Sequence, residues 1–419
     1  MNMDKMKKVP EIRFKGYEGE WNETPLCEYL CVSNEKNASN VFNKYDIYSV
    51  SREYGVINQI EYQGKSFAGA SLTGYGIVHT WDIVYTKSPL KQQPYGIIKT
   101  NKTKNGIVSA LYGVFTPNEK VDSNFVQTYF ELDQRLNDYL RPLVNKGAKN
   151  TLLISDEDAI KGKVVFPKAE EQEKIVKMFN SLDHLIRKLE QKLEKLRNIK
   201  QSLLTQMFVN VNREGYAPLI RFNGYNNKWI MLTLNDISER ITRKNTNNES
   251  SLPLTVSAQY GLINQNDFFN SRIASKDVSG YYLIKNGEFA YNKSSSDGYP
   301  FGAVKRLDRY KMGVLSTLYI IFALNKDKID SDFLSIFFET DKWYEHISQR
   351  AAEGARNHGL LNISSEDFLD LKILTPKSKN EQNLIAGYVS ALDRLVERTS
   401  SKLTKLRTMK QSLLQKMFV

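Results

Sequence analysis

Cysteine and long apolar runs are almost missing from this chain of 419 residues. Cys27 and Cys31 are the only cysteines, which argues against a disulfide scaffold and fits a reducing compartment. No second Cys/His pair completes a zinc site around their CxxxC spacing, so we interpret them as two small residues of one element. No run approaches the roughly 18 apolar residues of a membrane span, and residues 1–10 lack the apolar core of a signal peptide. A cytoplasmic protein is expected.

Catalytic patterns are missing as well. Residues 64–66 (GKS) resemble the end of a phosphate-binding loop, but Gln59 stands where that loop requires its first glycine. The sequence has no GxGxxG, HExxH or GxSxG motif, no Asn-Pro-Pro-Tyr type of methyltransferase motif, and four histidines without ligand spacing. We therefore expect a non-catalytic chain that holds no metal or cofactor of its own.

Positive charge is in excess, with 59 Lys and Arg against 47 Asp and Glu, a net charge of +12. Such a balance favours a polyanionic partner, DNA or RNA first, although a merely soluble basic protein has the same composition.

An internal repeat is the most informative feature. Residues 200–209 (KQSLLTQMFV) return as residues 410–419 (KQSLLQKMFV), and further matches follow at offsets of 206 to 210. The matched stretches are 13–17 with 221–225, 54–59 with 260–265, 106–109 with 313–316, 147–150 with 354–357, and 171–172 with 381–382. Both halves are therefore expected to share one fold. The residues between the matches diverge, as in two binding heads with different targets, although neutral drift of loops predicts the same divergence.

Each half begins with a region of strands and short helices. Runs rich in Val, Ile, Tyr and Phe, separated by Gly, Asn, Ser and Pro, predict strands at 45–50, 76–85, 106–115 and 319–324. Helical patterns follow at 122–140 and 331–349. Each region is expected to be a mixed α/β domain of about 160 residues, an ordinary domain size.

Each half ends in a long helix. Residues 169–209 contain no Gly or Pro, and apolar residues recur there every seven positions. A second stretch with the same heptad spacing covers 379–419. The first seam consists of Ile175, Leu182, Leu189, Leu196 and Leu203 with Phe179, Ile186, Leu193, Lys200 and Met207. The second consists of Ile385, Leu392, Thr399, Leu406 and Leu413 with Val389, Val396, Leu403, Lys410 and Met417. About 40 helical residues make a rod of roughly 60 Å, and the two rods most simply bury each other.

Two directions of pairing are open at this point. An antiparallel pair places the two globular regions at opposite ends, whereas a parallel pair places them together. Either way the order predicted is a target-binding domain at 1–168, a helix at 169–209, a second domain at 210–377 and a second helix at 378–419.

Several of the repeated motifs resemble the specificity subunit of type I restriction–modification systems. Residues 147–155 (GAKNTLLIS), 166–167, 171–172, the rod at 182–196 and KQSLLTQMFV resemble one conserved region of that family. Residues 354–364, 375–376, 381–382 and KQSLLQKMFV resemble the other. The resemblance extends over essentially the whole chain, while the variable regions match in framework only.

The resemblance implies a fold of mixed α+β class, with two target-recognition domains and two helices in an antiparallel coiled coil. Each domain would bind one half of a bipartite DNA target, and the coil would set the gap, so that inserted helical turns lengthen it. Two modification subunits, which bind S-adenosylmethionine and methylate adenine, would be recruited, and then restriction subunits that use ATP and magnesium. None of these cofactors is expected on this chain.

Candidate DNA contacts come from loops, because base readout uses Arg, Lys, Asn and Gln while phosphate contact uses Lys, Arg and Ser. In the first half they are Tyr85, Lys87, Lys91, Gln92, Lys99, Lys102, Lys104, Lys146, Lys149 and Asn150. In the second half they are Arg240, Arg243, Lys244, Asn292, Lys293, Ser294, Arg350, Arg356 and Asn357. Tyr85 and Lys87 recur as Tyr291 and Lys293. The tyrosines either stack on a distorted base or belong to the core, and the lysines either contact phosphate or are surface residues.

Two rival functions remain. A non-catalytic coiled-coil scaffold with protein-binding heads would lack the salt-sensitive DNA affinity of a DNA reader. A fused methyltransferase or a nuclease would need catalytic motifs that the two repeats leave no room for.

Overall fold

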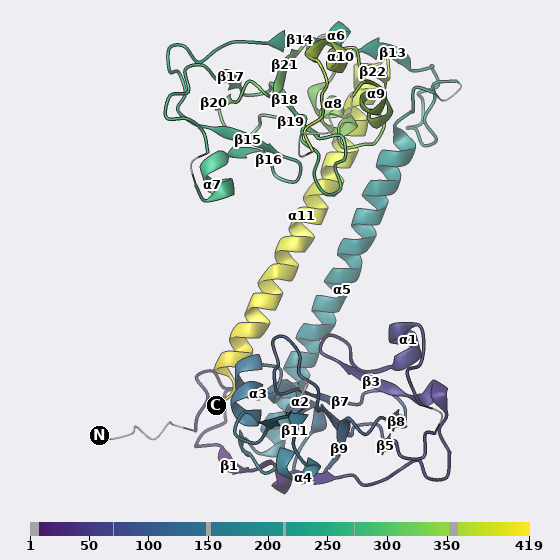
Figure 1. The fold of residues 1–419 in the computed structure, drawn as a ribbon, viewed down its shortest axis with the longest axis vertical. Helices are drawn as coiled ribbons and strands as arrows, with labels where there is room; N and C mark the ends of the chain where they lie inside the picture. Colours follow the sequence, from purple (N-terminus) through teal and green to yellow (C-terminus); the bar gives the residue numbers. More distant parts are fainter. Residues whose placement is uncertain (1–7, 70, 148–151, 213–214, 272, 352–358) are drawn as a thin grey trace. The chain divides into compact units, whose positions relative to one another are not determined.

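The structure is a computed structural model that describes residues 8–69, 71–147, 152–212, 215–271, 273–351 and 359–419 (Figure 1). It divides into two compact units. Unit 1 is Met1–Glu190 with Ser401–Val419, and unit 2 is Gln191–Ser400. Each unit therefore contains one globular region, here called head 1 (residues 1–168) or head 2 (residues 210–377), together with parts of both long helices.

Head 1 is built on a four-stranded antiparallel sheet in the order β2-β9-β6-β7. Its strands are Leu30–Val32 (β2), Tyr112–Pro117 (β9), Ile83–Thr86 (β6) and Ile97–Thr100 (β7). Two-stranded pairs add β1 (Asn22–Pro25) with β12 (Lys163–Phe166), β3 (Tyr48–Ser51) with β4 (Gly55–Asn58), β5 (Gly76–Val78) with β8 (Gly106–Val108), and β10 (Asn145–Lys146) with β11 (Leu152–Leu153). The central strand β6 is buried along its whole length, so both faces of the sheet are covered.

Short helices complete head 1. They are η1 (Leu26–Glu28), η2 (Lys44–Asp46), α1 (Gln59–Gln63), α2 (Ser123–Tyr129), α3 (Asp133–Leu140) and α4 (Asp156–Ala159). Polar side chains fix where α2 and α4 begin, because Asp122 and Ser155 accept hydrogen bonds from the otherwise unpaired backbone N–H groups of the first turn.

Head 2 repeats this architecture. Its sheet has the order β14-β21-β18-β19, formed by Ser238–Ile241, Ile320–Leu324, Phe289–Asn292 and Ala303–Arg306. The pairs are β13 (Ile230–Thr233) with β22 (Lys372–Thr375), β15 (Leu254–Ser257) with β16 (Gly261–Asn264), and β17 (Tyr282–Lys285) with β20 (Met312–Leu315). The helices are α6 (Leu234–Ile237), α7 (Gln265–Phe269), α8 (Ser331–Phe337), α9 (Tyr344–Arg350) and α10 (Ser365–Leu369). The prediction that both halves share one mixed α/β fold is confirmed.

The two long helices are α5 (Ala169–Met207) and α11 (Lys379–Lys416), within two or three residues of the predicted bounds. They pair antiparallel within each unit. In unit 1, Asp183 of α5 contacts Lys410 of α11, while Glu190, later in α5, contacts Arg407, earlier in α11. In unit 2, Lys200 of α5 contacts Asp393 of α11. Within each unit the two helices therefore run antiparallel.

The heptad seam lies on the inner face of both helices. Every seam position of α5 and α11 is buried or half-buried. Positions between them are mostly exposed and polar, as expected for a two-helix pair that shares one apolar stripe.

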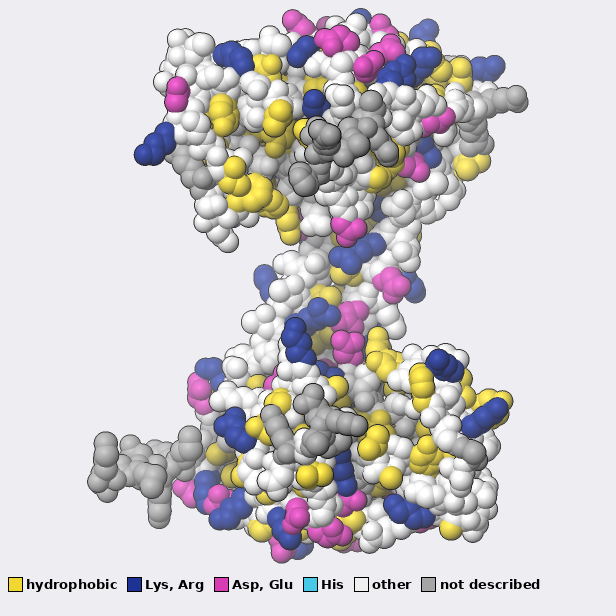
Figure 2. All heavy atoms as spheres, viewed as in Figure 1, with side chains coloured by type: hydrophobic (Ala, Val, Ile, Leu, Met, Phe, Trp, Pro, Cys, Tyr) yellow, Lys and Arg dark blue, Asp and Glu magenta, His cyan; other side chains and the backbone are white. Residues whose placement is uncertain are grey.

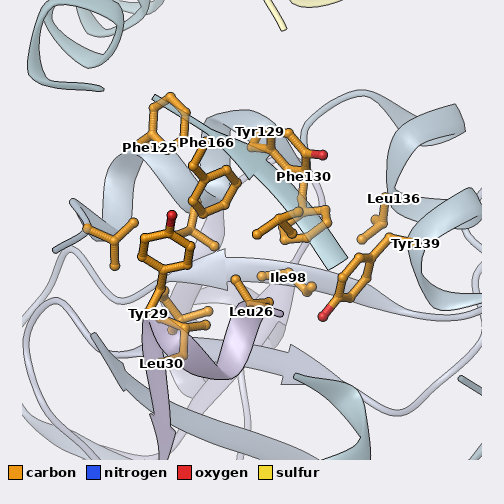
Figure 3. Close-up of a cluster of buried hydrophobic side chains, with 14 of the residues drawn as sticks. Leu26, Tyr29, Leu30, Ile98, Phe125, Tyr129, Phe130, Leu136, Tyr139 and Phe166 are labelled. Atoms are coloured by element: carbon orange, nitrogen blue, oxygen red, sulfur yellow. The ribbon is translucent and has the colours of Figure 1, made fainter. Parts of the chain in front are cut away.

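The C-terminal end of each long helix enters a hydrophobic core. In unit 1, the Phe418 ring lies 5.6 Å from that of Phe125 and 5.9 Å from that of Tyr129, centroid to centroid. Figure 3 shows Phe125 and Tyr129 in this core together with Phe166 and Tyr139. In unit 2, Phe208 at the end of α5 packs in the same way against Phe333, at 5.3 Å. The repeated KQSLL…MFV motif is therefore a core-packing element of both units.

The repeated Arg and Glu-Gln motifs fasten the beginning of each long helix to its head. Arg13 donates to both carboxylate oxygens of Glu171, at 2.8 and 2.9 Å, and Arg221 does the same to Glu381, at 2.7 and 2.9 Å. Next to Glu171, the buried Gln172 donates to the Pro167 carbonyl and accepts the backbone N–H of Asp122. These kept residues are structural, which explains why both halves retain them.

Some predicted elements are wrong in their extent. The predicted strands at 76–85 and 106–115 are each two strands, because sharp turns at 79–82 and 109–111 separate β5 from β6 and β8 from β9. The predicted helices at 122–140 and 331–349 are likewise each two short helices. Periodicity of apolar residues continues across such turns, so it hides them.

Among the described residues, no helix has the length and apolar character needed to cross a membrane.

Candidate nucleic-acid interface

Lys87 and Lys293 are equivalent positions of the two repeats, and they directly follow the central strands β6 and β18. Both are half-buried. Lys87 Nζ lies 2.9 Å from Asp156 Oδ1, and Lys293 Nζ donates to the Ile363 carbonyl at 3.4 Å. Each lysine thus ties the end of a central strand to the segment that leads toward the long helix. A phosphate contact by either lysine would have to compete with this partner.

The kept tyrosines are core residues. Tyr85 and Tyr291 are 0% exposed, and burial raises the pKa of both phenols. Their hydroxyls donate to the carbonyls of Tyr95, at 2.6 Å, and Phe301, at 2.9 Å. A side chain without exposed surface cannot stack on a base, so Tyr85 is removed from the candidate DNA contacts. The alternative that these tyrosines belong to the core is the one that the structure adopts.

Three of the five candidate cations of head 2 that the structure describes have an acidic partner within the head. Arg243 Nη2 lies 2.8 Å from both carboxylate oxygens of Glu288, Arg240 lies 3.2 Å from Glu366, and Arg350 lies 3.0 Å from Asp370. Lys244 donates to the Gly280 carbonyl and sits over the Tyr282 ring at 4.2 Å. The half-buried Asn292 donates to the Val256 carbonyl at 3.2 Å. Ser294, next to Lys293, is exposed, and its backbone N–H donates to Asn292 Oδ1 at 3.0 Å.

In head 1 the exposed candidates gather on two loops. Lys91 and Gln92 lie between β6 and β7, where Gln92 accepts from Arg52. Lys102 and Lys104 lie on the loop between β7 and β8, and Lys104 is 75% exposed with only a 4.0 Å approach to Asp46. Figure 2 shows Lys and Arg spread over both heads on the face in view, without one dominant patch. A DNA surface would therefore be built from loops.

The charge of Lys99 is influenced by an ion cluster at the helix pair. Lys99 is half-buried, and burial lowers its pKa although Glu131 opposes the shift. Glu131 lies 2.7 Å from Lys410, which also contacts Asp183 at 2.6 Å. Lys99 therefore faces the junction between head 1 and the helices, where its charge is partly balanced by Glu131.

Unit 2 repeats this cluster with the helices exchanged. Lys200 of α5 lies 2.8 Å from Glu339 and 2.5 Å from Asp393. Lys305 takes the place of Lys99, and burial lowers its pKa while Glu339 raises it. The polar seam positions Lys200 and Lys410 are thus the ion pairs that seat each helix pair on a head.

Five candidates fall wholly or partly outside the described residues. Lys149, Asn150, Arg356 and Asn357 lie outside the described residues, and the side chain of Lys146 does as well. The described part of the chain contains no group of three His, Cys, Asp or Glu residues arranged to hold a metal ion.

Two exposed features were missed in the sequence. Trp81 is 50% exposed in the turn between β5 and β6, a turn hidden inside a predicted strand. In unit 1, a groove of about 500 Å³ on α11 is lined by Ile12, Thr404, Lys405, Thr408, Met409, Ser412 and Leu413. Met409 is 44% exposed, and its repeat partner Ile199 is 47% exposed, as expected of positions just outside a heptad seam. An exposed apolar residue at the same place in both repeats is the signal that identifies this surface.

Comparison with solved structures identifies a whole-chain counterpart. The S subunit of a type I restriction–modification system from M. genitalium aligns with 98% of this chain and 99% of its own, with a TM-score of 0.58 at 12% identity. The chain has the fold of that S subunit. The antiparallel helix pair and the two heads are therefore an S-subunit architecture, as the sequence motifs indicated.

Two more solved structures are similar over most of the chain. The HsdS subunit from Thermoanaerobacter tengcongensis matches 95% of this chain and 96% of its own, with a TM-score of 0.46 at 13% identity. A structure from work on complex assembly and conformational transition of the type I R-M system matches 95% of this chain and 97% of its own, with a TM-score of 0.48 at 13% identity. No family model matches the sequence.

Proposed function

We propose that this chain is the DNA-specificity subunit of a type I restriction–modification complex, in which each head reads one half of a bipartite target. The observation that carries this proposal is the repetition of one head fold in a chain with the fold of an S subunit along its length. Two readers on one chain fit a target with two half-sites, because protein repeats generally match repeats in the DNA they bind.

Residues that are repeated in both halves, and loop residues that differ between them, support a shared framework with two different DNA-reading surfaces. The pairs Arg13–Glu171 and Arg221–Glu381 are kept and serve the fold. Exposed loop residues differ between the heads, as with Lys91 and Lys104 in head 1. Different loops on one framework are what two different half-sites require.

Recruitment of partners is the second part of the proposal. The groove beside Met409 and the matching apolar surface at Ile199 offer one docking site in each unit, which fits two copies of one modification subunit. In this proposal that subunit binds S-adenosylmethionine and methylates adenine, whereas restriction subunits use ATP and magnesium. This chain contributes no catalytic group.

Methylome sequencing tests the proposal. The chain is co-expressed in a methylation-free host with a modification subunit that forms a complex with it, and adenine methylation is mapped. A new bipartite motif with a fixed gap, present only when this chain is present, is the expected result. A soluble complex of the two proteins without any methylated motif would contradict DNA reading and favour a protein-binding scaffold.

A further inference from the structure

A tryptophan occupies a backbone conformation in head 1 that normally selects glycine. Trp81 has φ +74° in the turn between β5 and β6, and its side chain is half-exposed. Its backbone N–H donates to the Asn101 carbonyl at 2.7 Å, and the Asn101 N–H donates to the Asp82 carbonyl at 2.8 Å. The conformation is therefore fixed by paired backbone hydrogen bonds.

Head 2 builds the same turn with glycine. Gly287 has φ +83° between β17 and β18. Its N–H donates to the Leu307 carbonyl at 2.8 Å, and the Leu307 N–H donates to the Glu288 carbonyl at 2.9 Å. The two turns share a positive φ and the same pair of backbone hydrogen bonds. Trp81 therefore occupies a position whose backbone conformation favours glycine.

Tryptophan at this place weakens the fold in two ways. A side chain with a Cβ is strained in the left-handed region, and a half-exposed indole keeps apolar surface in water. Backbone outliers of this kind persist where a function needs them. The feature to be explained is thus an aromatic ring presented on the surface of head 1.

The neighbouring loop carries the other groups of a nucleic-acid contact. Thr80 donates through its N–H to Asn105 Oδ1 at 2.9 Å and through Oγ1 to the Thr103 carbonyl at 2.7 Å. The loop held in this way also carries Lys104, whose side chain is 75% exposed, and Lys102, whose pKa is lowered by burial although Glu131 and Asp183 oppose the shift. Exposed aromatic rings combined with lysines on adjacent loops are a recurring arrangement at nucleic-acid surfaces, where the ring stacks and the cations meet phosphates.

The difference between the heads indicates which partner the ring serves. A protein that docks once on each head would need the same surface on both, but the counterpart of Trp81 has no side chain. In the proposed function, the two heads differ in the DNA half-site that each one binds. We propose that Trp81, with the loop at 101–105, is a DNA-contact site that reads the half-site of head 1. This inference rests on the proposed function and adds the contacting residue.

The structure supplies variants that separate folding from binding. Gly287 shows that glycine suits the turn, and Asn40 and Asn248 show that asparagine is accepted in the left-handed region of this chain. W81G and W81N are therefore expected to keep the melting temperature of the full chain within about 4 °C of wild type. W81F retains an aromatic ring and serves as the matched control.

Intrinsic fluorescence reports on the ring directly. The other three tryptophans, Trp21, Trp229 and Trp343, are at most 3% exposed. The complex of this chain with its modification subunit is titrated with a duplex that carries the motif methylated by the wild type. Quenching that disappears in W81F and W81G alike identifies the indole as its source.

Affinity and methylation decide the inference. Loss of one stacked aromatic is expected to weaken binding by about 5- to 150-fold in W81G and W81N, and much less in W81F. Methylation is expected to relax at the first half of the motif while the second half is unchanged. Variants that match the wild type in affinity and motif would overturn the inference, as would quenching by the modification subunit without DNA. A wild-type complex that methylates no motif would instead contradict the proposed function itself.

Discussion

At the scale of single residues, buried ion pairs are expected to contribute more to the stability of the fold than the many exposed pairs. Glu171 is 2% exposed and depends on Arg13, whereas Lys8 and Glu23 form a pair at the surface. Replacement of Arg13 by methionine leaves a buried carboxylate without its partner and is expected to cost about 3–5 kcal/mol. Urea denaturation of the full chain measures this loss.

The matched control is K8M, which removes an exposed pair and is expected to cost no more than about 1 kcal/mol. Equal losses in R13M and K8M would mean that the Arg13–Glu171 pair does not hold head 1 to α5.

Low pH is expected to lower the stability of unit 1 because Glu131 becomes protonated. Burial alone would raise its pKa, but Lys410 and Lys99 outweigh burial and lower it below the ordinary 4.5. A lowered pKa in the fold means that the carboxylate stabilises the protein above about pH 4.5 and ceases to do so as the pH falls through the folded value. E131Q should therefore melt below the wild type at pH 6 and approach it near pH 3. A melting difference that is constant from pH 6 to pH 3 would contradict this.

At the scale of elements, the groove on α11 and its counterpart on α5 make a prediction about assembly. Met409 and Ile199 are exposed and outside the seam, so a charge there should leave the helix pair intact. M409E and I199E are each expected to remove one of two bound modification subunits, and together to remove both. Light scattering of the purified complex measures the mass. A double variant that still binds two subunits would exclude this surface.

Elements differ in how far the sequence predicts them. The heptads of α5 and α11 extend over ten seam positions each, so their periodicity fixes the helix bounds within a few residues. The turn around Trp81 has no Gly or Pro, so nothing in its residues distinguished it from a strand. The kept Tyr85 and Lys87 raised the same difficulty, because repetition marks the framework as well as any binding surface. Framework residues and binding residues are distinguished by how deeply they are buried and by which groups they contact, and both properties are known only once the fold is known.

At the scale of the whole molecule, the helix pair should set the gap in the DNA target. Seven residues that continue the heptads can be inserted after Glu190 in α5 and after Ser400 in α11, where the two units meet along the chain. Each insertion adds about 10.5 Å of helix, equivalent to about three base pairs. A methylated motif with unchanged half-sites and a gap longer by up to about three base pairs is expected.

Insertion in α5 alone is the control, because it shifts the seam out of register with α11 and should reduce methylation. A double insertion with the original gap would contradict a spacing role for the helices.

The central claim, that each head reads one half-site, is tested most directly with residues 1–209 alone. Residues 200–209 nearly repeat residues 410–419, so a second copy can supply the segment that fills the core of head 1. Methylome sequencing of this half-chain with the modification subunit should yield a palindromic motif made from one half-site of the full-length motif and its inverse. A motif identical to the asymmetric one of the full chain would contradict the claim, because head 2 would then contribute nothing to recognition.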